Sequence, residues 1–289
     1  MFPANDPKTV RRQYASDVYL RIRRETHEQY TVPKVDFPQW VLHRLQWRGD
    51  EHILDIGAGD GSYYEALRRN WPDVTYHGVD QSPGILRVHP AHKAVTVADA
   101  QALPYADGTF DTVMANHMLY HVPDIEQAIL EGRRVLKPEG VFMAATNSIQ
   151  SMPEFHALFR RGMLLLSTPG KIYSQPPLPA QTSFALENGT RILSRYFYGV
   201  VRYDLPSTLV FPSVEPVMAY IESMRSMREP QLPETINWDD LMLVMREQVS
   251  RVLTHFGELV VNKVSGVLVA SNQGGFIREF VHELHDKTT

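Results

Sequence analysis

Two hydrophobic patterns alternate along residues 50–147 of this 289-residue chain. Short apolar runs are typical of buried strands, whereas an apolar residue at every third or fourth position is typical of an amphipathic helix. The predicted strands are residues 52–56, 74–80, 93–98, 109–115 and 141–146, and the helices between them are residues 63–70, 82–88 and 124–136. Strands that alternate with helices predict an α/β fold with a parallel, doubly wound sheet.

The alternation stops on both sides of this region. Helical patterns dominate there, at residues 8–30, 39–47, 151–168, 186–196, 214–227 and 238–256. Two β-rich segments, at residues 199–211 and 259–271, bring the predicted sheet to seven strands, mostly parallel. We expect a single domain over residues 1–289, with an N-terminal helical cap at 1–47, an α/β core at 48–147, a cap region at 148–257 that contains the sixth strand, and a last strand at 258–272.

Composition mainly excludes classes of protein. With 43% hydrophobic and 21% charged residues, the chain is ordinary globular material. A net charge of −4 and dispersed arginine pairs argue against a nucleic-acid partner. The absence of cysteine excludes disulfides and thiol chemistry and fits a cytoplasmic location. The N-terminus has no apolar signal core, and the apolar stretch near residues 163–166 is far below the ~20 residues of a membrane span. The oligomeric state is left open.

A glycine-rich turn follows the first predicted strand. Gly57, Gly59 and Gly61 stand at alternate positions before a helical pattern, so a ligand can approach bare backbone and the free N–H groups of a helix start. Asp80 ends the next strand, 23 positions after Gly57. That is where a βαβ nucleotide site places the acceptor for ribose hydroxyls. The glycine turn and Asp80 together leave two interpretations open, a dinucleotide site and an S-adenosylmethionine site.

Five sequence blocks resemble the class I S-adenosylmethionine-dependent methyltransferases, in particular the small-molecule, ubiquinone/menaquinone methyltransferase-like branch (type 11). The blocks are Leu54–Gly61, Gly78–Ser82, Ala98–Tyr105, Phe110–Val113 and Glu131–Gly140. The resemblance covers residues 50–147 and implies a Rossmann-like core. The spacing G-x-G-x-G also leans away from a dinucleotide enzyme, which has G-x-G-x-x-G. Glu139 is a small departure, since the family more often has glycine there.

The resemblance implies S-adenosyl-L-methionine as cofactor and S-adenosyl-L-homocysteine as product. Around the methionine part we expect Asp55, Gly57, Ala58, Gly59 and Gly61. Asp80 is expected to accept both ribose hydroxyls, which a carboxylate can do. On the adenine side we expect Gln81, Asp99, Ala100 and Leu103. Asn116, Met118 and Tyr14 complete the predicted cofactor-binding set.

Methyl transfer is an in-line displacement, so the protein mainly positions the acceptor and excludes water. His117 and Tyr120 follow the strand at 109–115, and we predict that they face the transferred methyl and orient or deprotonate the acceptor. No metal is expected, because the pair His117 and His121 has no acid at ligand spacing.

The most consistent function is methyl transfer to a small organic acceptor, because a large aromatic-rich cap suits a small molecule better than a protein or RNA surface. Three alternatives stay open at this point. They are a non-catalytic domain that binds S-adenosylmethionine, an RNA methyltransferase and, least consistent with the glycine spacing, an NAD-dependent oxidoreductase. No membrane partner is expected.

Overall fold

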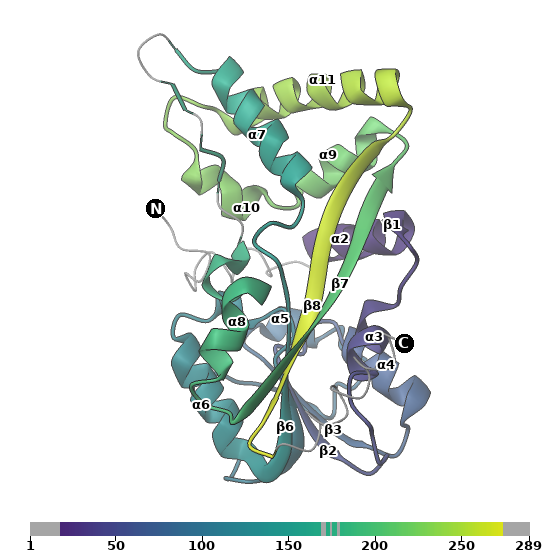
Figure 1. Ribbon diagram of the computed structural model, residues 1–289, viewed down its shortest axis with the longest axis vertical. Coiled ribbons are helices and arrows are strands. Elements are labelled where there is room, and N and C mark those ends of the chain that lie inside the picture. The colour runs from purple at the N-terminus through teal and green to yellow at the C-terminus, as the bar shows by residue number, and fades with distance from the viewer. Residues whose placement is uncertain (1–17, 169–171, 174, 178–179, 274–289) are drawn as a thin grey trace, which may run out of the picture.

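The computed structural model describes residues 18–168, 172–173, 175–177 and 180–273, and its centre is one open sheet (Figure 1). The strand order is β1-β7-β8-β6-β5-β2-β3-β4. The strands are β1 (Thr31–Val32), β2 (His52–Ile56), β3 (Thr75–Asp80), β4 (Val95–Val97), β5 (Phe110–Met114), β6 (Leu136–Asn147), β7 (Gly199–Phe211) and β8 (Leu259–Ser271). Strands β6, β5, β2, β3 and β4 run parallel, and β8 is antiparallel to both β6 and β7. The predicted mostly parallel α/β fold is therefore confirmed.

The sheet differs from the prediction in two details. It has an eighth strand, because β1 pairs with the edge of β7 through Thr31 and Leu209. A strand of two residues has no periodicity that a sequence pattern can report. Strand β6 also begins at Leu136, five residues before the predicted start, and Leu136 pairs with Phe110 across a register shift. Residues 137–140, which lie between the predicted helix and the predicted strand, therefore belong to the strand.

Ten α-helices lie among the described residues. They are α2 (Val18–Tyr30), α3 (Phe37–Leu42), α4 (Ser62–Asn70), α5 (Pro83–Leu86), α6 (Ile125–Val135), α7 (Pro153–Leu165), α8 (Leu186–Leu193), α9 (Val214–Glu222), α10 (Arg225–Arg228) and α11 (Trp238–Phe256). Single turns of 3-10 helix are η1 (Leu119–His121), η2 (Ala180–Ser183) and η3 (Glu229–Gln231). Helix α11 has both expected boundary signals, since Asn237 accepts from Asp239 N at 2.7 Å and Gly257 follows with φ 80°. None of the helices in the described part of the chain is long and apolar enough to cross a membrane.

Helices cover both faces of the sheet. On one face, Val41 of α3 and Leu67 of α4 pack against Val267 and Val269 of β8. On the other face, Ile129 of α6 and Leu193 of α8 join a core with Phe142 and Leu268. This arrangement leaves the two ends of the parallel strands as the places where a ligand can reach the sheet.

Strands β7 and β8 extend far beyond the carboxyl end of β6. Strand β6 pairs with β8 only from Val141↔Ser271 to Asn147↔Ser265, whereas β7 and β8 remain paired as far as Phe211↔Leu259. The two strands form an arm that carries α7, α9 and α11 above the sheet (Figure 1). These helices share a second core with the arm, built around Phe159, Phe211, Trp238 and Met245. The cap is thereby held over the carboxyl edge of the parallel strands.

Candidate cofactor and acceptor site

The glycine turn lies at the carboxyl end of β2 and is fixed to the neighbouring strand. Gly57 N and Ala58 N both donate to Val79 O, at 2.7 and 3.0 Å. The turn then opens into α4, whose first N–H groups have no partner earlier in the helix. This is the edge of a doubly wound sheet at which ligands bind.

Gly57 and Gly59 serve different purposes in the turn. Both have left-handed backbone, with φ of 74° and 56°. A Cβ on Gly57 would lie 2.7 Å from Met118 Cβ, so this glycine makes room for the segment after β5. A Cβ on Gly59 would meet nothing closer than Gly57 O at 3.8 Å. Space for a ligand is therefore kept open at Gly59, while Gly57 and Met118 contact each other.

Asp80 connects this turn to β3. Its Oδ2 accepts from Gly59 N at 3.1 Å and its Oδ1 accepts from Ser82 N at 2.8 Å. Burial raises the pKa of the carboxyl group, and the backbone hydrogen bonds oppose that effect. A carboxylate has about four acceptor positions, so each oxygen retains capacity for a ligand hydroxyl.

Asp55 lies beneath the turn. It is 1% exposed and accepts a hydrogen bond from Tyr76 OH at 3.0 Å, while His89 Nε2 lies 3.3 Å from the same hydroxyl. Ala91 N donates to His89 Nδ1 at 3.0 Å, so in neutral His89 the proton is on Nε2 and points to Tyr76. Burial raises the pKa of Asp55 to about 7, against the hydrogen bond from Tyr76. Asp55 therefore holds Tyr76 of β3, a contact that we did not predict.

Asp55→Asn is expected to change how stability depends on pH. Because the folded pKa is raised, the folded chain retains a proton that the unfolded chain loses above pH ~4. The wild type should lose stability relative to Asp55→Asn as pH rises from about 4 to about 7, by on the order of 3 kcal/mol. Urea unfolding of both proteins at pH 4.5 to 8 measures the difference. An unchanged difference across that range would show that Asp55 is ionised in the folded protein.

The segment after β4 forms the predicted adenine side. Asp99 Oδ1 accepts from Gln101 N at 2.9 Å and from Gln101 Nε2 at 3.0 Å. Leu103 N donates to Glu131 Oε2 at 2.8 Å, and Arg134 binds both Leu103 O and Glu131. Sequence reasoning did not assign Gln101, Glu131 and Arg134, although all three stand in the blocks that carry the resemblance. Ala100 is buried and Gln81 is exposed beside Asp80.

The segment after β5 brings Asn116, His117 and Met118 to the same edge. Asn116 is 6% exposed; its Oδ1 accepts from Ala145 N at 2.9 Å, and its Nδ2 is buried with no protein partner. An orphaned buried donor fits a site that gains a partner from a ligand. His117 has φ 55°, rare for a residue other than glycine, and its ring packs 5.3 Å from that of Phe37.

His117 and Tyr120 face different surroundings. Burial, followed by the charge of Lys263, lowers the pKa of His117 to about 4. Tyr120 is buried in the core on the α6 side, with its ring 4.5 Å from that of His121. The structure therefore places His117 toward the cap and Tyr120 toward the core. Within the described ranges no three metal-binding side chains gather, and Tyr14 lies outside those ranges.

Helix α2 contacts the glycine turn through an ion pair. Arg24 NH1 lies 2.5 Å from Asp60 Oδ2, and Asp60 Oδ1 accepts from Ser62 N at 3.3 Å. The N-terminal helical segment is thereby attached beside the turn. Sequence reasoning missed this contact, because no local pattern connects residues that are 36 positions apart.

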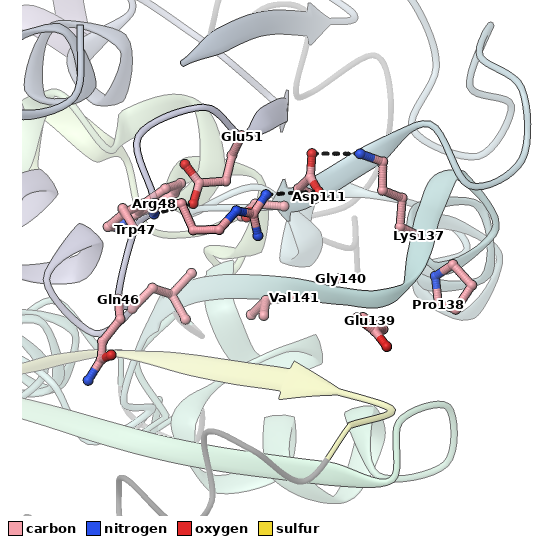
Figure 2. A pocket seen from close by; sticks show the side chains of 12 residues that line it. Gln46, Trp47, Arg48, Glu51, Asp111, Lys137, Pro138, Glu139, Gly140 and Val141 are labelled. Carbon is pink, nitrogen blue, oxygen red and sulfur yellow. Dashed lines mark hydrogen bonds and ion pairs between the residues drawn. The ribbon is translucent and has the colours of Figure 1, made fainter. Parts of the chain in front are cut away.

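A pocket of about 500 Å³ lies at the opposite, amino edge of the sheet (Figure 2). Arg48 and Lys137 both reach Asp111 there, at 3.3 and 2.8 Å. Arg48, Asp111 and Lys137 already pair with one another there, and the pocket is separated by the length of the strands from Asp80 and Asn116. We therefore assign the candidate site to the carboxyl edge. The unusual Glu139 lines this remote pocket, so it does not touch the candidate site.

Comparison with known proteins agrees with this geometry. Residues 54–144 match the family model described as a methyltransferase domain. A malonyl-[acyl-carrier protein] O-methyltransferase of Halorhodospira halophila is 30% identical over 157 residues, covering 52% of this chain and 51% of that protein. A ubiquinone/menaquinone biosynthesis C-methyltransferase of Desulfotalea psychrophila is 32% identical over 139 residues, covering 44% of this chain and 56% of that protein. The chain spans about half the length of these curated relatives.

A solved structure shows the same fold. Phosphoethanolamine N-methyltransferase 2 of Haemonchus contortus, in complex with S-adenosyl-L-methionine, matches with a TM-score of 0.55 and 15% identity, over 94% of this chain and 61% of that chain. The family match and the glycine turn confirm the resemblance found in the sequence. Residues 54–144 of this chain are similar to a methyltransferase domain, and the chain shares its fold with an S-adenosylmethionine-bound methyltransferase.

Proposed function

We propose that this protein transfers a methyl group from S-adenosylmethionine to a small organic acceptor. The observation that carries the proposal is the set of groups left available at one sheet edge. These are the open space at Gly59, the remaining acceptor positions of Asp80 and the orphaned Nδ2 of Asn116. They come from the ends of β2, β3 and β5, and the contact between Met118 and Gly57 connects them.

The residues present fit this cofactor. When bound, S-adenosylmethionine supplies a methyl group on a positively charged sulfur. A nucleophile can attack the methyl carbon and displace the sulfur as S-adenosylhomocysteine. Gly59 leaves room beside its backbone, Asp80 accepts hydroxyl hydrogens and Asn116 Nδ2 donates. The helices that the β7–β8 arm holds over this edge exclude water and position the acceptor.

The acceptor side of the proposal rests on the cap. Phe155, Phe159 and Tyr220 line the core that the cap helices build, so the cap is apolar and aromatic. Relatives named for malonyl-[acyl-carrier protein] and for quinone biosynthesis support a small or acyl-carrier-bound organic acceptor. A cytoplasmic location stays a prediction.

Thermal unfolding with S-adenosylmethionine, S-adenosylhomocysteine and NAD in parallel tests the proposal. A ligand at about 100 times its Kd adds roughly 2.7 kcal/mol to the free energy of unfolding. We expect both adenosyl compounds to raise the melting temperature and NAD to leave it unchanged. A response to NAD alone would overturn the proposal. Binding without turnover on any small acceptor would favour the non-catalytic alternative, and turnover on RNA alone would favour an RNA methyltransferase.

His117→Asn is expected to lower methyl transfer roughly tenfold while cofactor affinity is kept. The expected loss is modest, because an imidazole with a pKa near 4 is neutral at pH 7 and accepts hydrogen bonds, but is a weak base. Asparagine tolerates the left-handed backbone at this position, so the fold should persist. Initial rates on the first acceptor found by screening measure the effect, with exposed His92→Asn as the matched control. Full turnover in His117→Asn would exclude the predicted role.

A further inference from the structure

A group of basic side chains lies between helix α2, the β7–β8 arm and helix α9. We call His27, Lys263 and Tyr220 the basic cluster, since the Lys263 ammonium group and the Tyr220 hydroxyl both contact the His27 ring. Lys263 Nζ lies 3.1 Å from His27 Nδ1 and donates to Thr31 Oγ1 at 3.0 Å. His27 Nε2 lies 3.3 Å from Tyr220 OH. The cluster thus joins α2, β1, β8 and α9 at the base of the cap.

The hydrogen bonds show which donors and acceptors of the basic cluster already have a partner. His27 Nδ1 accepts from Lys263, so in neutral His27 the proton is on Nε2 and points to Tyr220 OH. Tyr220 OH in turn donates to Met152 Sδ at 3.5 Å. An ammonium group has three N–H donors, and two of those on Lys263 have partners. One strong, positively charged donor is left available.

The cluster has an excess of positive charge. Burial, followed by the charges of Lys263, His117 and Arg23, lowers the pKa of His27 to about 3. Burial also lowers the pKa of Lys263 to about 8. Among the residues that the structure describes, no carboxylate contacts His27 or Lys263. A half-buried cation without an acid beside it costs stability, so a functional reason for its presence is needed.

The cluster lies on the acceptor side of the proposed transfer site. Lys263 stands on β8 two residues before Ser265, which pairs with Asn147 at the carboxyl end of β6, and His117 N donates to Ala145 O of the same strand at 2.8 Å. Helix α2 presents His27 one turn after Arg24, the residue that binds Asp60 of the glycine turn. The same helix therefore contacts both the cofactor turn and the basic cluster.

We propose that the basic cluster binds an oxyanion of the methyl acceptor, so that the acceptors of this protein are carboxylates or similarly charged acids. This inference rests on the proposed function and names its substrate class. The remaining N–H donor of Lys263 is the primary contact, because this ammonium group is the charged donor of the cluster. Charge-assisted hydrogen bonds are roughly twice as strong as neutral ones, so a single such contact can select an acid over its amide.

The test compares acids with their neutral amides in the presence of saturating S-adenosylhomocysteine. The probes are butyrate and benzoate against butanamide and benzamide, at equal ionic strength and pH 7. We expect the acids to raise the melting temperature of the wild type and the amides to leave it unchanged. In Lys263→Met the response to the acids should be lost, with at least about tenfold weaker binding by calorimetry. Exposed Lys93→Met is the matched control and should respond as the wild type does.

The ligand-free variant gives a second, independent readout. Since no acid in the described part of the chain contacts Lys263, Lys263→Met should melt at a higher temperature than the wild type before any probe is added. Lys263→Gln, which retains a polar side chain, should also lose the acid response. Equal responses to acids and amides, or an acid response retained in Lys263→Met, would overturn the inference. Failure of S-adenosylhomocysteine itself to bind would instead overturn the proposed function.

Discussion

Asp80→Ala is expected to weaken S-adenosylhomocysteine binding by roughly hundredfold, which corresponds to about 2.7 kcal/mol. The change removes the proposed acceptor of two ribose hydroxyls. It also removes the hydrogen bonds that Asp80 accepts from Gly59 N and Ser82 N, so the turn itself is loosened. Calorimetric titration of wild type and variant measures the difference.

Asp80→Asn separates the two contributions. Asparagine retains one acceptor oxygen and nearly the same shape, so we expect an intermediate loss of roughly tenfold. Asp73→Asn is the control. Asp73 is exposed in the turn before β3, and its substitution removes one negative charge from the same region. Equal affinity in Asp80→Ala and wild type would place the cofactor away from β3 and contradict the assigned site.

Alanine substitutions at Gly57 and Gly59 are expected to affect different properties, the first mainly stability and the second mainly cofactor binding. Gly57→Ala should destabilise the fold by roughly 2–4 kcal/mol, because its Cβ would lie 2.7 Å from Met118 Cβ in a backbone that disfavours any side chain. Gly59→Ala should lower the free energy of unfolding by only about 1–2 kcal/mol, the cost of a left-handed backbone for a residue with a Cβ. The added Cβ would meet no protein atom closer than 3.8 Å. Its methyl group would instead occupy the space assigned to the cofactor.

Urea unfolding and cofactor titration of both variants form the measurement. We expect Gly59→Ala to lose at least about tenfold in cofactor affinity, ~1.4 kcal/mol, with a smaller loss of stability than Gly57→Ala. Gly108→Ala is a useful control, because Gly108 also has positive φ, at 61°, and open space around it, but lies in the loop before β5. Normal cofactor binding in Gly59→Ala would show that the ligand does not approach this backbone.

The sequence by itself determined seven strands of the sheet, the long elements of the cap and the glycine turn. The bounds of β7, β8 and α11 agree with the periodic patterns at 199–211, 259–271 and 238–256. Such patterns are reliable because a long element repeats its buried face many times. Gly57, Gly59 and Asp80 could be identified because a turn and the acid of the following strand are close in sequence.

Only the tertiary structure decided what each polar group contacts. Asp55 stays a predicted cofactor residue, and the hydrogen bond that its buried carboxyl accepts from Tyr76 OH had no signal in the sequence. The eighth strand, the ion pair of Arg24 with Asp60, and the contact of His27 with Lys263, 236 positions apart, have no local signature. A periodic hydrophobic pattern indicates that one face of a helix or strand is buried, but it does not indicate which residues cover that face. The proposed acceptor side of this protein therefore depends on long-range packing, whereas its proposed cofactor side depends on a short, local motif.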